Sequence, residues 1–81
     1  MTRIIIADAL DLVADGLRFR LVGQTDLSIV AHTGTGTDLL ALLKHTEVDL
    51  VMLDVSLPGK DGIDTMRAIH KQFPSIRVLA H

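Results

Sequence analysis

The chain has 81 residues, of which 48% are apolar and 22% are charged, and its formal net charge is −2 at pH 7. This balance predicts one small folded domain and excludes the low-hydrophobicity, high-charge composition of disordered segments. Scattered basic residues and an aromatic content of 2% argue against a nucleic-acid-binding surface or a stacking platform for bases. Because the chain has no cysteine, disulfides and thiolate metal sites are excluded.

From the amino terminus onward, short β-branched runs alternate with segments whose apolar residues recur every three or four positions. The first run is too short for a membrane span or a signal-peptide core, so we expect a cytoplasmic protein with no membrane partner. Such runs are typical of strands buried on both faces, and the longer segments are typical of amphipathic helices. In chain order, the predicted elements are a strand at 3–7, a helix at 10–23, a strand at 27–31, a helix at 35–43, a strand at 49–54, a helix at 63–73 and a strand at 76–80.

Single helices between successive strands predict an α/β fold with a doubly wound parallel sheet, because parallel pairing requires crossovers that place helices on both faces. Two cap signals support the helix boundaries. Thr35 followed by Asp38 resembles a capping box, and Pro74 ends the last helix. The loop at residues 34–36 has two glycines but lacks the rest of a dinucleotide or P-loop fingerprint, so no phosphate role is expected there.

Two aspartates directly follow predicted strands, Asp8 after the first and Asp54 at the end of the third. Ligands of open parallel sheets bind at the carboxyl ends of the strands. If the two strands are neighbours, two carboxylates lie side by side and repel one another. A divalent cation relieves this repulsion, and oxygen ligands suit Mg²⁺. The alternative is that both residues only begin solvated turns, which is common for Asp.

The histidines give a weaker signal for a site. None has a spacing typical of metal ligands, and we expect all of them on the surface. They are His32, His45, His70 and His81.

The residues around Asp54 carry a more specific pattern. Residues 51–62, Val-Met-Leu-Asp-Val-Ser-Leu-Pro-Gly-Lys-Asp-Gly, resemble the phosphorylation-site segment of bacterial two-component response-regulator receiver domains. Residues 5–18 are similar to the opening of receivers that carry a C-terminal LuxR-type helix-turn-helix output domain. The resemblance implies a flavodoxin-like (CheY-like) sheet with strand order 2-1-3-4, and residues 1–81 would be a partial receiver domain without the fifth strand and the last two helices.

The resemblance also implies a chemistry, in which Asp54 accepts a phosphoryl group from a histidine kinase and the protein signals without being an enzyme. A carboxylate suits this role because it is ionised at neutral pH and needs no base to activate it. By the family pattern, Mg²⁺ would be held by Asp8, Asp54 and the main-chain carbonyl of Ser56. The metal would offset the repulsion between the carboxylate and the incoming phosphoryl group.

Two departures from the family pattern weaken this expectation. Receivers usually have two adjacent acids after the first strand, but here Ala9 follows Asp8, so we expect weaker Mg²⁺ binding. The hydroxyl residue and the lysine that read out the phosphate in the family lie beyond the fourth strand, and Lys60 on another loop does not replace that lysine. An incomplete sheet leaves an open edge at the fourth strand, which predicts a homodimer or an element-exchanged oligomer.

Two other functions remain open from the sequence. The first is a phosphorylation-independent, receiver-like dimerisation or interaction module, which Ala9 and the missing lysine favour. The second is an aspartyl-phosphate hydrolase on a related sheet. That chemistry generally uses a second Asp two residues after the nucleophile, where this chain has Ser56.

Overall fold

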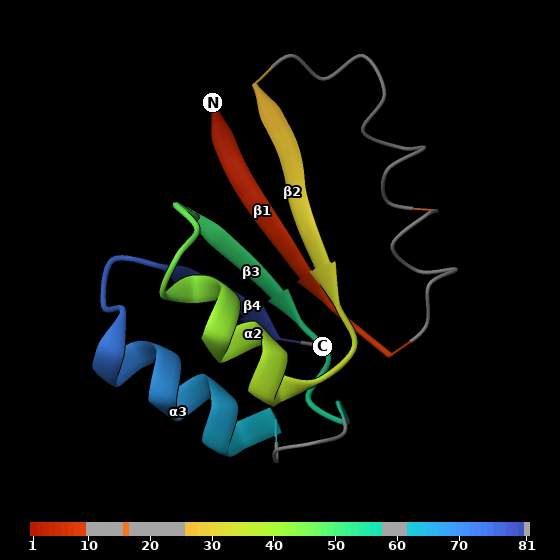
Figure 1. Cartoon of the computed structure of the whole chain (residues 1–81), viewed down its shortest axis with the longest axis vertical. Helices are drawn as coiled ribbons and strands as arrows, with labels where there is room; N and C mark the ends of the chain where they lie inside the picture. Colours follow the sequence, from red (N-terminus) through yellow and green to blue (C-terminus); the bar gives the residue numbers. More distant parts are fainter. Residues whose placement is uncertain (10–15, 17–25, 58–61, 81) are drawn as a thin grey trace.

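The computed structural model of the chain describes residues 1–9, 16, 26–57 and 62–80 (Figure 1). Within these residues, the chain forms four strands and two helices. They are β1 (Thr2–Ala7), β2 (Leu27–Thr33), α2 (Gly36–Leu43), β3 (Leu50–Leu53), α3 (Gly62–Gln72) and β4 (Arg77–Ala80). The helix predicted at residues 10–23 lies outside the described residues, apart from Gly16.

The four strands form one parallel sheet in the order β2-β1-β3-β4, which confirms the predicted strand order. Helices α2 and α3 lie side by side and cover the same face of this sheet (Figure 1). Because all four strands run in the same direction, their carboxyl ends meet along one edge of the sheet. No helix within the described ranges is long and apolar enough to cross a membrane.

Strand β1 lies inside the sheet and is buried on both of its faces, which explains its unbroken β-branched run. On one face, Ile5 and Ala7 belong to the main hydrophobic core beneath α2 and α3. On the other face, Ile4 and Ile6 are buried in a smaller cluster. The main core also contains buried residues from both helices and from β3, namely Leu39, Leu43, Val51, Leu53 and Ile69.

The pairing of β2 with β1 contains an irregularity that the sequence did not predict. Ile4 pairs with Ile29 and Ile5 pairs with Ala31, so Val30 has no partner on β1. Side chains alternate between the two faces of a strand, and one extra residue therefore reverses the faces of all positions beyond it. Consistent with this, Ile29 packs against the smaller cluster, whereas Ala31 packs against the main core.

Strand β2 also ends two residues later than predicted. His32 and Thr33 were expected in a turn-rich loop, but they pair with Ile6 and Ala7 of β1. The prediction was wrong because the polar sequence from His32 onward favours a turn, while the ladder with β1 continues to the end of that strand. The cap predicted for α2 is confirmed, since the Thr35 hydroxyl accepts a hydrogen bond from the Asp38 main-chain N–H at 3.1 Å.

Candidate functional site

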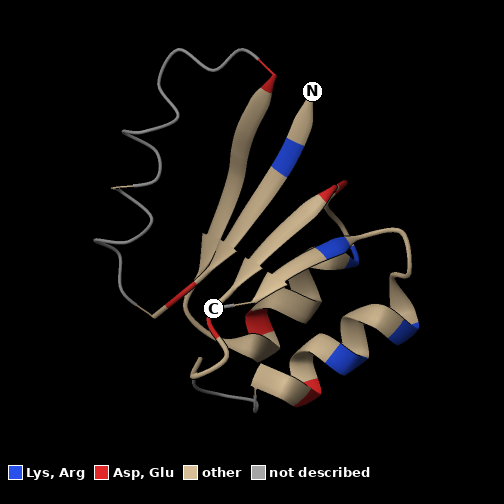
Figure 2. Cartoon of the chain, turned by 180° about the vertical axis from the view of Figure 1, so that it is seen from behind, with Lys and Arg blue, Asp and Glu red and all other residues tan. Residues whose placement is uncertain are grey.

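Asp8 and Asp54 lie next to each other at the carboxyl edge of the sheet, as predicted. Ala7 pairs with Leu53, and the main-chain N–H of Asp54 continues the ladder by donating to the Ala7 carbonyl at 2.9 Å. By strand alternation, both aspartates fall on the face of the smaller cluster, opposite the face covered by α2 and α3. Figure 2 shows acidic segments following both β1 and β3 at this edge.

The carboxylate of Asp54 is oriented by the turn that follows it. Its Oδ1 accepts a hydrogen bond from the Ser56 main-chain N–H at 2.9 Å and another from the Ser56 hydroxyl at 2.7 Å. The Asp54 carbonyl accepts from the N–H of Leu57 at 3.1 Å, and the side chain of Leu57 is buried in the main core. A buried leucine thus anchors the turn, and two donors in this turn fix the direction of the Asp54 carboxylate.

Gly62 begins α3 and lies against the main chain of Val55, in the loop after Asp54. A Cβ atom at this position would overlap the main-chain carbonyl and Cα of Val55. Only glycine permits so close an approach, because its Cα carries no side chain. Gly62 therefore allows the start of α3 to pack directly against the loop after Asp54.

Asp8 is 4% exposed, and β2 holds the main chain on both sides of it. Its N–H donates to the Thr33 carbonyl at 3.0 Å. Its carbonyl lies 2.9 Å from Nε2 of His32. Because a carbonyl can only accept, this contact assigns the proton to Nε2. The surface position expected for His32 is therefore wrong, since the residue is only partly exposed and its ring contacts the site.

The oxygen-rich character of this edge fits a hard divalent cation. The side chains of Asp8 and Asp54 and the main-chain carbonyl of Ser56 supply oxygen atoms, which Mg²⁺ prefers. Within the described part of the chain, no group of three or more His, Cys, Asp or Glu residues could hold a metal ion. Mg²⁺ does not require such a group, because it is commonly bound by one or two carboxylates and completes its octahedral shell with water. Ala9 is exposed and adds no side-chain ligand.

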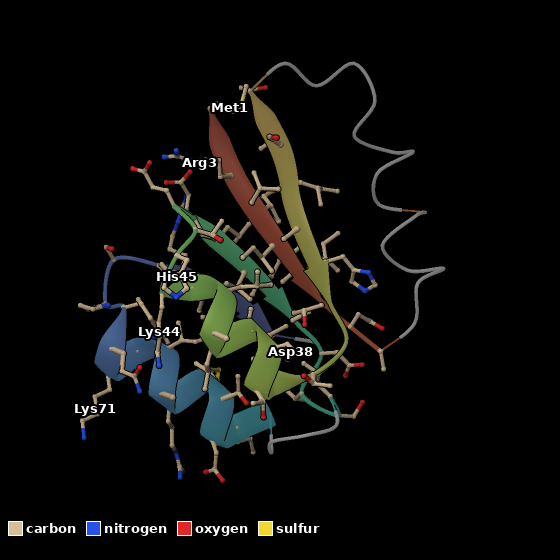
Figure 3. The ribbon with its side chains drawn as sticks, in the orientation of Figure 1. Met1, Arg3, Asp38, Lys44, His45 and Lys71 are labelled. Carbon is tan, nitrogen blue, oxygen red and sulfur yellow. The ribbon has the colours of Figure 1, made fainter. Side chains whose placement is uncertain are left out.

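A second charged cluster lies at the other end of the sheet, where Figure 3 shows Arg3 near the start of β1. The Arg3 main-chain N–H donates to Oδ2 of Asp49 at 2.7 Å, and its guanidinium Nη1 lies 2.9 Å from Oε2 of Glu47. The guanidinium Nε is 3.7 Å from the same Asp49 oxygen. The main-chain hydrogen bond from Arg3, with a smaller effect of its positive charge, lowers the pKa of Asp49.

An open pocket of about 450 Å³ lies between the end of β2 and α2. Its lining residues are His32, Thr33, Asp38, Ala41, Leu42 and His45. Figure 3 places Asp38 in the first turn of α2 and His45 beyond the last turn. The pocket was not predicted, because it depends on how the edge strand packs against a helix and no sequence motif marks it.

The fold and the paired aspartates define a class, a parallel α/β protein with an acidic site at the carboxyl edge of strands β1 and β3. Residues 4–81 match the family model described as the response regulator receiver domain. The chain belongs to this family, whose members are the receiver modules of two-component signalling systems.

Curated relatives agree with this membership. The chain is 36% identical over 77 residues to the uncharacterized transcriptional regulatory protein YhcZ of Bacillus subtilis, covering 95% of this chain and 36% of that protein. It is 30% identical over 79 residues to the response regulator GacA of Pseudomonas aeruginosa, covering 98% of this chain and 37% of GacA. The chain thus spans little more than a third of the length of these relatives.

Solved structures agree as well. The isolated REC domain of RcsB from Salmonella enterica serovar Typhimurium, determined with the phosphomimetic BeF₃⁻, superimposes with a TM-score of 0.89 at 29% identity. That match covers 98% of this chain and 59% of the RcsB domain. A structure of two RcsB dimers bound to two parallel DNAs gives a TM-score of 0.92 at 28% identity, over 99% of this chain and 42% of RcsB.

Proposed function

We propose that Asp54 accepts a phosphoryl group from the phosphohistidine of a histidine kinase, in a reaction that requires Mg²⁺. The observation that carries this proposal is the pair of hydrogen bonds from Ser56, which hold the Asp54 carboxylate in one direction beside the buried Asp8. A nucleophile held in a fixed direction reacts faster because its orientation is already determined before the phosphoryl donor arrives.

In the proposed step, an Asp54 carboxylate oxygen forms a bond to phosphorus while the phosphorus–nitrogen bond of the phosphohistidine breaks. The imidazole nitrogen leaves with the bonding electron pair, and it takes up a proton from solvent. Both Ser56 donors hold Oδ1, and the Leu57 side chain keeps the loop in place while the phosphoryl group moves. Mg²⁺, when bound, would neutralise the charge shared by the carboxylates and the phosphoryl oxygens.

The metal ligands in this proposal are Asp8, Asp54 and the main-chain carbonyl of Ser56. Since Ala9 stands where the family usually has a second acid, Mg²⁺ affinity is expected to be lower than in a receiver with two adjacent acids. This same residue favours a second candidate, a receiver-like interaction module that works without phosphorylation.

Several properties of the whole protein belong to the same proposal. Residues 1–81 would be part of a single receiver domain in a cytoplasmic, non-enzymatic regulator. The relatives named as transcriptional regulators support a DNA-binding output domain, which we propose to be of the LuxR type. The RcsB dimers support a homodimer, and an element-exchanged oligomer is the alternative. Neither the receiver residues themselves nor their scattered charge would provide the DNA contact.

The test is to incubate the full-length protein with acetyl phosphate and Mg²⁺ and to follow the intact mass. We expect the gain of one phosphoryl group in the unmodified protein and no gain in Asp54→Asn. Asp64→Asn is the matched control, because it removes the same charge from the exposed first turn of α3 and should still be phosphorylated. Absence of any mass gain in the unmodified protein, with a fold intact by circular dichroism, would contradict the proposal and favour the interaction module.

A further inference from the structure

His32 contacts the site, but it is not a candidate metal ligand or nucleophile. Its Nε2 donates to the main-chain carbonyl of Asp8, while the next residue, Thr33, accepts from the Asp8 N–H. The two peptide groups flanking Asp8 are thereby tied to the end of β2, one by the His32 side chain and the other by the regular ladder. These bonds restrict rotation of the main chain at the residue whose carboxylate reaches the site.

The position of His32 depends on the irregularity at Val30. If β2 kept all its residues and alternated regularly beyond Ile29, residue 32 would fall on the face covered by α2 and α3. With the irregularity, His32 pairs with Ile6 and lies on the same face as Ile6 and Asp8. Bulges next to functional sites commonly redirect one side chain toward the site. Here the redirected side chain is the one that reaches the Asp8 carbonyl.

This arrangement matters because strand β1 supplies one acidic residue to the edge instead of two. Ala9 is exposed and has no carboxylate, so the contribution of β1 to a cation site depends on the direction of the Asp8 side chain. A ligand with a fixed direction loses less conformational entropy when it binds a metal than one that must be ordered on binding.

We infer that His32 is a positioning residue for the Mg²⁺ site, which fixes the Asp8–Ala9 peptide and so directs the Asp8 carboxylate toward Asp54. The inference rests on the proposed function, because it concerns the same cation. His32 acts through its hydrogen bond to the main chain and makes no direct contact with the metal. It partly compensates for the missing second acid.

The test compares three variants of the full-length protein by Mg²⁺ titration, followed through the amide NMR signals of Asp54 and Ser56. His32→Phe keeps a ring but removes the donor, and we expect Mg²⁺ affinity to fall about tenfold, as for other groups that orient metal ligands. His32→Gln keeps an N–H donor and should restore most of the affinity. His45→Phe is the matched control, because His45 lies beyond the end of α2 and should leave Mg²⁺ affinity unchanged.

A second measurement separates positioning from loss of structure. The ¹³C chemical shift of the Asp8 carbonyl should change in His32→Phe and return toward its original value in His32→Gln, while the thermal midpoints of all three variants stay close together. Equal Mg²⁺ affinity in the unmodified protein and His32→Phe would overturn the role of His32 and leave the proposed function standing. An unmodified protein that binds no Mg²⁺ would instead overturn the metal site itself, and the inference with it.

Discussion

The two ends of the sheet hold their acidic residues in different ways. At the amino-terminal end, the Arg3 guanidinium pairs with Glu47 and lies 3.7 Å from Asp49, so a positive charge within the protein partly offsets the two negative charges. At the carboxyl end, two of the groups that orient Asp54 are the main-chain N–H and the hydroxyl of Ser56, which are neutral donors. Neutral donors fix the direction of a carboxylate without cancelling its charge.

This difference separates a structural cluster from a site suited to an added cation. An ion pair satisfies its own partners, and an exposed one contributes little to the free energy of unfolding. Carboxylates oriented by neutral groups keep their attraction for a cation or an electrophile. A main-chain N–H donates to an aspartate at both ends, so the guanidinium of Arg3 is what gives the amino-terminal end its different electrostatic character.

The largest expected effect on stability comes from Gly62→Ala, at the carboxyl end. The added methyl group would overlap the main chain of Val55, and relief requires the loop or the start of α3 to move. We expect the free energy of unfolding to fall by about 1–3 kcal/mol, typical of overpacking, together with slower phosphorylation of Asp54. Urea unfolding and the mass assay measure the two effects.

Gly34→Ala is the control for this substitution, since a Cβ there has no heavy atom within 4 Å. It should leave both measurements close to those of the unmodified protein. If both alanine variants behaved alike, the close approach of Gly62 to the loop would have no functional meaning.

A smaller effect is expected from Ser56→Ala, which sharpens the comparison by removing one neutral donor. The hydroxyl bond to Oδ1 of Asp54 is lost, but the main-chain bond from the same residue remains. One hydrogen bond contributes about 1 kcal/mol, so the rate of phosphorylation should fall by no more than roughly fivefold. The rate is measured from the mass gain with acetyl phosphate over time. A Ser56→Thr variant keeps the hydroxyl and should react at nearly the original rate.

The smallest effect is expected at the amino-terminal end, in Asp49→Asn. The folded state lowers the pKa of Asp49 below its ordinary value of 3.8, chiefly through the Arg3 main-chain hydrogen bond. A lowered pKa contributes stability that is present above the ordinary pKa and is lost as pH falls through the folded value. The variant should therefore be slightly less stable at neutral pH, and the difference should shrink below about pH 4.

Urea unfolding at a series of pH values measures this difference, with Asp26→Asn as a control that removes the same charge from the exposed turn before β2. Phosphorylation of Asp54 should not change in Asp49→Asn. A loss of phosphorylation equal to that of Gly62→Ala would show that the two ends are not independent.

The sequence predicted the strands and the two described helices because each depends on local patterns, whereas the strand order followed from the family resemblance. The β-branched run of β1 and the cap at Thr35 are examples that the structure confirms. The positions of Asp8 and Asp54 followed from the same reasoning, since residues that end neighbouring parallel strands must share an edge. Their roles as metal ligands and phosphoacceptor stay predictions.

The contact between His32 and Asp8 could not be predicted in this way. It depends on how β2 pairs with β1 beyond Val30, and nothing in the residues 27–33 distinguishes a bulged strand from a regular one. The polar residues from His32 onward also favoured a loop over a strand. The Asp8 carbonyl can accept a hydrogen bond from His32 only because β2 lies beside β1 in the sheet.

The irregularity at Val30 also has an evolutionary consequence. Val30 is 40% exposed and has no partner on β1, so its identity should drift readily among descendants of this protein. Deleting the residue would leave a strand of regular alternation, in which Ile29, Ala31 and His32 keep their present faces and partners. This position should therefore tolerate both substitution and loss, and descendants whose β2 is one residue shorter here should still hold His32 beside Asp8.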